Sequence, residues 1–206
     1  MNLTKQAILC ISTIILIGLS GCARYRALPL NRLTPKILPN AQDRCISFEY
    51  RIFTRDDCTL YLDRNVISKG YQPVQITLNN NTNRYLSLSL MNFSFPCVPV
   101  EAIARKVHTS TMKRAVSYGV AGLFIWPFLI PAVVDGIGSS EANEELDADF
   151  TRKALREDQI INPFHMINGL IFVPIEYFSP QFSLTLIDRE TQKLFMLDTA
   201  KTILKI

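Results

Sequence analysis

Apolar and polar residues alternate along four segments in the first half of the chain. The alternation is clear in Ile46–Ile52, Val74–Leu78 and Tyr85–Leu90, and weaker in Leu60–Leu62. A period of two places apolar side chains on one face of a strand, as a half-buried sheet requires. Asn79–Asn83 suits a turn, because asparagine tolerates the left-handed backbone conformations that turns use. We therefore expect Val74–Leu78 and Tyr85–Leu90 to form a hairpin.

A second group of strands is predicted near the C-terminus. Gly169–Val173 is a continuous apolar run, and Phe182–Leu186 alternates. The polar turn Asp188–Gln192 then leads into Lys193–Leu197, which completes a second predicted hairpin. Short alternating strands in two groups favour a β-sandwich.

Residues 98–158 separate the two groups of strands and have the periodicity of helices. Ser139 and Ser140 can cap the second predicted helix, whose acidic start and basic end complement the helix dipole. The fold class is therefore mainly β (α+β): a β-sandwich from residues 45–97 and 159–206, interrupted by a helical insertion. The predicted apolar stripes are Val100, Ile103, Ala104, Val107 and Thr111 in the first helix, and Ala142, Leu146, Phe150 and Ala154 in the second.

Residues 115–134, within this insertion, are twenty consecutive residues without a charge. As a helix they would span about 30 Å, the hydrocarbon thickness of a bilayer. A transmembrane helix is one interpretation of the segment. It would leave Lys113 and Arg114 outside the cytoplasm and carry Asp135 inside, against the positive-inside tendency.

Two other interpretations stay open. The segment can form a helical hairpin, broken by Pro127 and Pro131, that packs in the domain core or dips into the bilayer. Gly136 and Gly138 would then allow a turn before the capped helix. Alternatively, the segment forms a surface that is buried only against a partner. Trp126 is either an interfacial anchor or a core residue in these arrangements.

The N-terminal residues have the three parts of an export signal. Lys5 supplies a positive charge, Ala7–Leu19 is apolar, and Leu19–Cys22 has the sequence Leu-Ser-Gly-Cys. These last four residues resemble the lipobox of bacterial lipoproteins. The resemblance implies that the Cys22 thiol is joined to diacylglycerol and that residues 1–21 are then removed as a signal peptide.

The resemblance also implies where the protein is held. The position directly after Cys22 is Ala23, followed by Arg24, and not Asp, as in lipoproteins sorted to the outer membrane and facing the periplasm. Stable anchoring takes two or more acyl chains such as palmitate, each buried methylene contributing roughly 0.8 kcal/mol. Residues 22–44 contain three prolines among basic and amide residues, which predicts an extended tether behind the lipid.

A further resemblance is carried by Pro73–Leu90, the Gly-containing apolar run that follows, Asp135–Asn143 with Asp147–Leu155, and Gly169–Pro174. In this order the segments are similar to a group of bacterial lipoproteins, in which an immunoglobulin-like sandwich is interrupted by a hydrophobic segment rich in small residues. The resemblance implies this architecture, with a helical, hydrophobic hairpin as the insertion, and it implies no particular activity.

Three cysteines, Cys45, Cys58 and Cys97, remain after the predicted cleavage and lipidation. An exported compartment permits one disulfide among them, in any of three pairings. In a hairpin turning at Thr54–Asp57, Cys58 would face Phe53 rather than Cys45. Buried thiols or one structural bridge are expected, since no pair has the C-x-x-C spacing of zinc or thioredoxin-like sites.

The sequence contains no recognisable catalytic, cofactor-binding or metal-binding set. His108 and His165 lie in different segments and in no metal-ligand spacing. No phosphate loop, dinucleotide-binding pattern or G-x-S-x-G motif occurs, and a net charge of +4 is too small to predict nucleic-acid binding. An acidic group on the second predicted helix could hold a cation, although solvation explains it more simply. Its members are Glu144, Glu145, Asp147 and Asp149.

These features predict a non-catalytic envelope lipoprotein that serves as a membrane-tethered module for binding or assembly. Its expected partners are the membrane, through the lipid on Cys22 and through residues 115–134 in the bilayer-dipping arrangement, and a protein of the envelope. Two alternatives remain. One is an envelope hydrolase whose site the sequence does not reveal, and the other is a subunit of an oligomeric pore lined by residues 115–134.

Overall fold

The computed structural model describes residues 25–30, 45–108 and 129–199, without the side chains of residues 129–140. Its contacts divide the chain into two compact units. One unit contains residues 26–107 and 147 onward, and the remainder belongs to the other. The features predicted outside the described residues are the signal peptide, Cys22, residues 31–44 of the tether, residues 115–128 of the apolar segment, and Trp126.

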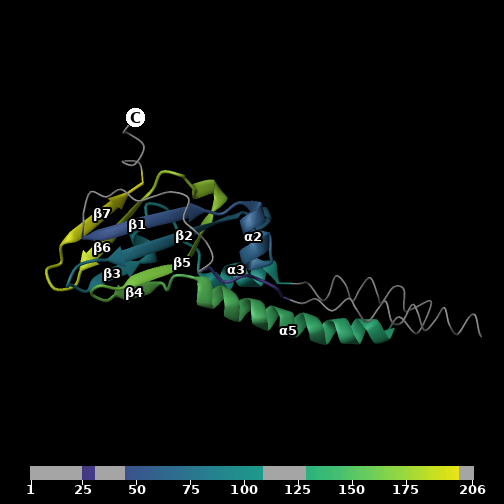
Figure 1. Ribbon diagram of the computed structural model, residues 1–206. Helices are drawn as coiled ribbons and strands as arrows, with labels where there is room; N and C mark the ends of the chain where they lie inside the picture. The colour runs from purple at the N-terminus through teal and green to yellow at the C-terminus, as the bar shows by residue number, and fades with distance from the viewer. Residues whose placement is uncertain (1–24, 31–44, 109–128, 200–206) are drawn as a thin grey trace, which may run out of the picture. The chain divides into compact units, whose positions relative to one another are not determined.

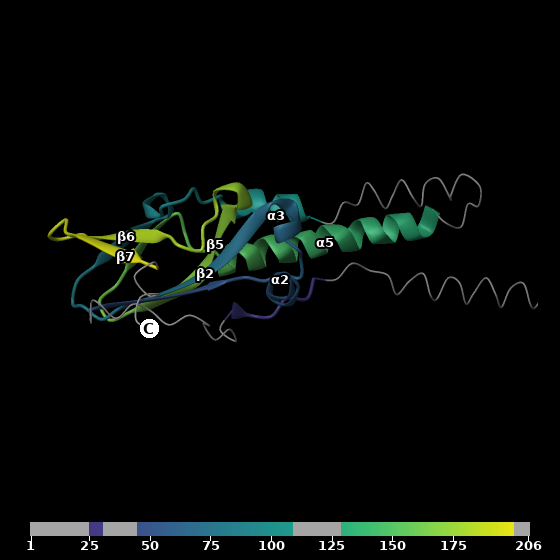
Figure 2. The same cartoon turned by 90° about the horizontal axis from the view of Figure 1, so that it is seen from above.

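Seven strands among the described residues form two antiparallel sheets, drawn in Figures 1 and 2. The three-stranded sheet has the order β1-β2-β5, and the four-stranded sheet has the order β4-β3-β6-β7. The strands are β1 (Ile46–Ile52), β2 (Tyr71–Asn80), β3 (Leu86–Ser89), β4 (Asp158–Ile161), β5 (Met166–Pro174), β6 (Ser183–Asp188) and β7 (Leu194–Asp198).

Alternate residues of both sheets point between the sheets and form one apolar core. The ring of Phe182, just before β6, lies at its centre, 5.1 Å from the Tyr50 ring and 5.0 Å from the Phe95 ring. The predicted mainly β fold class is confirmed, and the shared core makes the arrangement sandwich-like. The core includes Phe48, Val74, Ile76, Leu78, Ile171 and Val173 from the first sheet, and Leu86, Leu88, Ile161, Leu184 and Leu186 from the second.

The hairpin predicted between Val74–Leu78 and Tyr85–Leu90 is wrong. β2 pairs with β1 and β5, whereas β3 pairs with β4 and β6 in the other sheet. Residues 81–85 therefore cross between the sheets. The apolar side chains of β2 and β3 face each other across the core instead of lying side by side in one sheet. The second predicted hairpin is confirmed, because β6 and β7 pair along their length.

The strand predicted at Leu60–Leu62 is also wrong, because these residues end helix α2 (Arg55–Leu62). Thr54 caps this helix with a reciprocal pair of hydrogen bonds. Its hydroxyl accepts from the Asp57 amide at 3.2 Å, and the Asp57 carboxylate accepts from the Thr54 amide at 2.9 Å. The predicted turn at Thr54–Asp57 is thus the first turn of a helix.

Two helices occupy the described parts of the predicted insertion. Helix α3 (Val100–Val107) buries Ile103, Ala104 and Val107, as its stripe predicts. Helix α5 (Leu129–Lys153) buries Ala142, Leu146 and Phe150, again as predicted. No helix among the described residues is both long enough and apolar enough to span a membrane.

The predicted start of the second helix is wrong. Helix α5 begins at Leu129, ten residues before Ser139, so neither Ser139 nor Ser140 caps it. Gly136 and Gly138 lie inside the helix rather than in a turn. Pro131 is tolerated because it falls in the first turn, where the backbone amides have no intrahelical acceptor.

The connections between strands gather at two ends of the sheet-containing unit. The β2–β3, β4–β5 and β6–β7 connections are the short loops 81–85, 162–165 and 189–193, here called the loop end. The other connections carry α2, α3 and α5, and they define the helix end. They also carry the 3₁₀ helices η3 (Ile67–Lys69), η4 (Leu90–Asn92) and η6 (Ile175–Tyr177).

The helix end also receives residues 25–30. The Leu28 amide donates to the Leu60 carbonyl at 3.0 Å, the Arg26 amide donates to the Asp63 carboxylate at 3.2 Å, and Leu30 is buried. This short part of the predicted tether therefore contacts α2 and the residue that follows it.

The cysteines among the described residues are free thiols. Cys58 is completely buried on α2, Cys97 is half-buried, and Cys45 is exposed. No disulfide joins these three residues. Burial raises the pKa of the Cys58 thiol to about 11 and that of Cys97 to about 12, so both stay protonated at neutral pH.

Candidate functional site

Three short loops come together at the loop end, and buried polar side chains tie them to one another. The first of these is Asn80, the last residue of β2, which is 1% exposed. Its Nδ2 donates to the carbonyls of Arg84 at 2.8 Å and Asn162 at 3.0 Å. Its Oδ1 accepts from the amide of Thr82 at 3.1 Å and from the hydroxyl of Thr82 at 2.6 Å. One amide side chain thus joins the β2–β3 loop to the β4–β5 loop.

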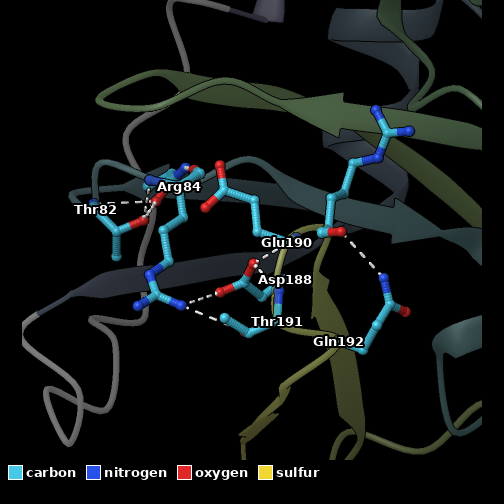
Figure 3. A network of polar contacts seen from close by, with 8 residues as sticks. Thr82, Arg84, Asp188, Glu190, Thr191 and Gln192 are labelled. Carbon is cyan, nitrogen blue, oxygen red and sulfur yellow. Dashed lines mark hydrogen bonds and ion pairs between the residues drawn. The ribbon is translucent and has the colours of Figure 1, made fainter.

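Asp188 joins the third loop to the first. Its Oδ2 accepts from Arg84 Nη1 at 2.7 Å, and its Oδ1 accepts from the amides of Glu190 and Thr191 at 2.9 and 3.1 Å. Figure 3 shows the Arg84 guanidinium reaching over to Asp188 and Thr191 at the β6–β7 turn. The Arg189 amide also donates to the Tyr85 carbonyl at 3.0 Å. The three loops therefore form one connected hydrogen-bond network.

The charge on Asp188 is stabilised where it lies. The carboxylate is completely buried, which disfavours ionisation, yet its pKa is held well below its ordinary value. The hydrogen bond from Arg84 is the largest cause, and the contacts to Thr191 and Glu190 add to it. The same ion pair raises the pKa of Arg84. At neutral pH the network contains an ion pair between the buried Asp188 carboxylate and the partly exposed Arg84 guanidinium.

Two residues of the loop end, Phe164 and Gln192, have a positive φ, at +55° and +58°. Phe164 is the more unusual of the two, because a bulky aromatic side chain rarely adopts this left-handed conformation and its side chain is 70% exposed. Two hydrogen bonds hold the backbone there. The Phe164 amide donates to the Thr82 carbonyl at 3.2 Å, and Asn80 Nδ2 donates to the carbonyl of Asn162, two residues before Phe164. Met166 and Tyr85 are exposed beside these loops, at 64% and 46%.

The loop end presents aromatic, methionine and amide side chains to solvent. Residues of these types are usual at protein-binding surfaces. His165 lies in this region, and its Nδ1 lies 2.8 Å from the Pro163 carbonyl. None of the ion pairs among the described residues includes it. No cluster of three potential metal ligands occurs among the described residues.

A groove lies between residues 90–101 and 151–157, away from the loop end. It is open, with a volume of about 620 Å³, and it is lined by apolar side chains that include Phe93, Phe95 and Leu155. Glu101, Arg156 and Glu157 are exposed along it, and no histidine lines it. The protonated Cys97 thiol at its wall is a poor nucleophile. The groove is large enough to hold a ligand or a peptide segment.

The other residues singled out in the sequence do not come together. His108 follows the last residue of α3, whereas His165 precedes β5. In the acidic group on α5, Asp149 is paired with Lys153 and, at 3.5 Å, with Arg152, which supports a structural role for that carboxylate. The predicted lipidation site, Cys22, lies outside the described residues.

Sequence patterns did not predict that Asn80, Asp188 and Phe164 belong to one site. Asn80 and Asp188 occur in segments predicted only as polar turns, and the two loops are far apart in the sequence. The one available signal was the density of asparagine in residues 79–83, which marks a turn but not its partners.

Comparisons of the chain with protein-family models, with curated proteins and with solved structures find no match.

Proposed function

We propose that this chain is a non-catalytic lipoprotein of the bacterial envelope, whose loop end binds another envelope component. The observation that carries the proposal is the exposed Phe164 side chain, held in a costly left-handed conformation by a buried polar network. A strained, exposed aromatic residue is unfavourable for an isolated domain, which supports a selected role in recognition.

The strand order supports an immunoglobulin-like version of the sandwich. In the constant-type immunoglobulin fold, the first, second, fifth and fourth strands form one sheet and the third, sixth and seventh form the other. Here only the fourth strand differs, because β4 pairs with β3 instead of β5. In this topology the loops after the second and sixth strands lie at the antigen-binding end of variable domains, which by analogy favours the loop end as a recognition surface.

The anchoring part of the proposal rests on the lipobox-like residues Leu19–Cys22. Labelling cells with a radioactive or alkyne-bearing palmitate should mark the wild-type chain and leave Cys22→Ala unmarked. An unlabelled wild-type chain would contradict the lipoprotein assignment. Residues 115–134 are proposed as a hydrophobic hairpin that adds to this attachment or to an assembly.

The binding part is tested by photocrosslinking in cells from Asn83, which is exposed in the β2–β3 loop. We expect an adduct in the wild type that is lost in Phe164→Asn, because asparagine keeps the left-handed backbone but removes the ring. Met196→Asn is the matched control, since Met196 is 73% exposed on β7 and lies outside the three loops. An adduct that both variants retain, or that both lose, would contradict a binding role for Phe164.

A further inference from the structure

Strand β7 is an edge of the four-stranded sheet, and no strand among the described residues pairs with its outer side (Figure 1). Hydrogen bonds toward β6 fix both ends of its ladder. The Lys193 carbonyl accepts one at 2.9 Å, and the Thr199 amide donates one at 3.0 Å. Backbone groups alternate in direction along an antiparallel strand, so those of Leu194 and Met196 point away from β6. The outer edge of β7 therefore presents two amides and two carbonyls to another strand.

The same two residues expose apolar side chains. Phe195 and Leu197 pack against the core, so Leu194 and Met196 lie on the opposite face of the sheet, where they are 62% and 73% exposed. On that face Leu194 pairs with Ile187 of β6, which is half-buried. An open strand edge with exposed apolar side chains is a site at which another strand can join the sheet.

The other three edges of the two sheets differ from β7. The outer edge of β5 is occupied, because the amides of Val98 and Leu155 donate to its carbonyls at 2.8 and 2.9 Å. Strand β4 has only four residues and begins with Asp158. Strand β1 contains Glu49 and Arg51 between its core residues. Short length and charged side chains limit the pairing of edge strands, whereas β7 begins with four consecutive apolar residues.

We propose that β7 is a dimerisation edge, at which two copies of this chain pair antiparallel about a two-fold axis. The outward backbone groups determine the register, because Leu194 of one copy can then exchange hydrogen bonds with Met196 of the second copy. Phe195 lies opposite Phe195 of the second copy, on the axis. The neighbouring two-fold register is less favourable, since it places Leu194 opposite Asp198.

A second copy suits this edge because the edge is complementary to itself. In the proposed register three successive cross-strand pairs are apolar, and no like charges lie directly opposite each other. The two-fold pairing uses the β7 edge of each copy, so the assembly closes at the dimer. The inference depends neither on the lipid proposed for Cys22 nor on binding at the loop end.

The test is photocrosslinking of the full chain in cells, from Lys193, which is exposed just before β7. Two copies with different epitope tags are expressed together, and we expect an adduct that carries both tags. Leu194→Lys should reduce this adduct by about tenfold, because it removes two apolar cross-strand pairs that each contribute up to about fivefold. The matched control is Ile160→Lys on β4, since Ile160 is 48% exposed on the same face of the sheet. It should change the adduct by less than about threefold.

A second variant separates lost pairing from lost folding. Leu194→Lys/Met196→Glu should restore the adduct, because the register places the two new, opposite charges across from each other. The absence of an adduct with both tags, equal losses in Leu194→Lys and Ile160→Lys, or no rescue by the double variant overturns the proposal. An adduct with a different protein, or one within a single chain, overturns it as well. The adduct from Asn83 tests the loop end separately and should persist in Leu194→Lys.

Discussion

At the scale of single residues, the loop end depends on two side chains that are costly to bury. An amide or carboxylate removed from water destabilises the fold unless its hydrogen bonds are replaced. Asn80 and Asp188 meet this condition by using both of their polar atoms on loop backbone or on Arg84. Their hydrogen bonds keep the three loops in one arrangement and hold Phe164 where it is exposed.

Replacing Asn80 by alanine should lower the free energy of unfolding by about 2–4 kcal/mol. The substitution removes the hydrogen bonds that the buried Asn80 amide makes to the carbonyls of Arg84 and Asn162 and to Thr82, and it leaves a gap in their place. Urea denaturation measures the change. The matched control is Asn79→Ala, since Asn79 is half-buried and its side chain has no comparable network. It should change the value by less than about 0.5 kcal/mol. Similar losses in both variants would contradict the role of Asn80.

Asp188 gives the molecule a pH dependence whose sign follows from its lowered pKa. In the unfolded chain an aspartate titrates at about 4, so the stabilisation from this carboxylate is complete above that pH. It is lost as the pH falls below about 4 toward the lower pKa of the folded state. Asp188→Asn should therefore be less stable than the wild type at neutral pH, and the difference should narrow in acid. Urea midpoints measured across this range provide the comparison, and a difference that does not change with pH would contradict the prediction.

At the scale of elements, the sequence predicted correctly the pairing of strands that are joined by a short turn. The β6–β7 hairpin was predictable because its polar turn, Asp188–Gln192, directly joins the alternating strand β6 to the apolar residues of β7, of which Phe195 and Leu197 pack against the core. The β2–β3 pair looks the same locally, but its partners are β1, β5 and β4, which lie far away in the sequence. Strand pairing across a sandwich is a non-local choice, so alternation alone could not exclude the hairpin.

The candidate site was unpredictable for the same reason. Its loops follow three different strands, and they meet only because the sandwich brings those strand ends together. A positive φ at Phe164 leaves no mark in the sequence, since phenylalanine is not a residue that favours it. The predicted chemistry was limited to Cys22, whose motif is contiguous.

Helix α2 offers a test of local chemistry. Its capping box at Thr54 explains why residues 55–62 are helical despite the apolar alternation at their end. Thr54→Ala should lower the free energy of unfolding by about 1 kcal/mol, because the Asp57 amide loses its acceptor. Thr59→Ala on the same helix is the control. Its hydroxyl only bonds back to the Arg55 carbonyl, so the change should be near zero or slightly stabilising. An equal loss of unfolding free energy in both variants would contradict a stabilising role for the Thr54 cap.

At the scale of the whole molecule, the sheet-containing unit has two structurally different ends. The helix end receives residues 26–30 and releases the chain at Val107. The loop end contains the buried polar network and exposes aromatic and methionine side chains. In the proposed function, the lipid attaches at Cys22 and the loop end binds the partner.

Removing the lipid tests how much of the attachment the rest of the chain provides. Cys22→Ala should leave the membrane fraction without a high-salt wash, because the proposed acyl chains are its main attachment. Wild-type protein should resist a high-salt wash. If the variant is released only by high salt, surface charges contribute to the attachment. If it resists high salt, the apolar segment 115–134 is itself an attachment, and crosslinking from that segment would identify whether bilayer or protein receives it.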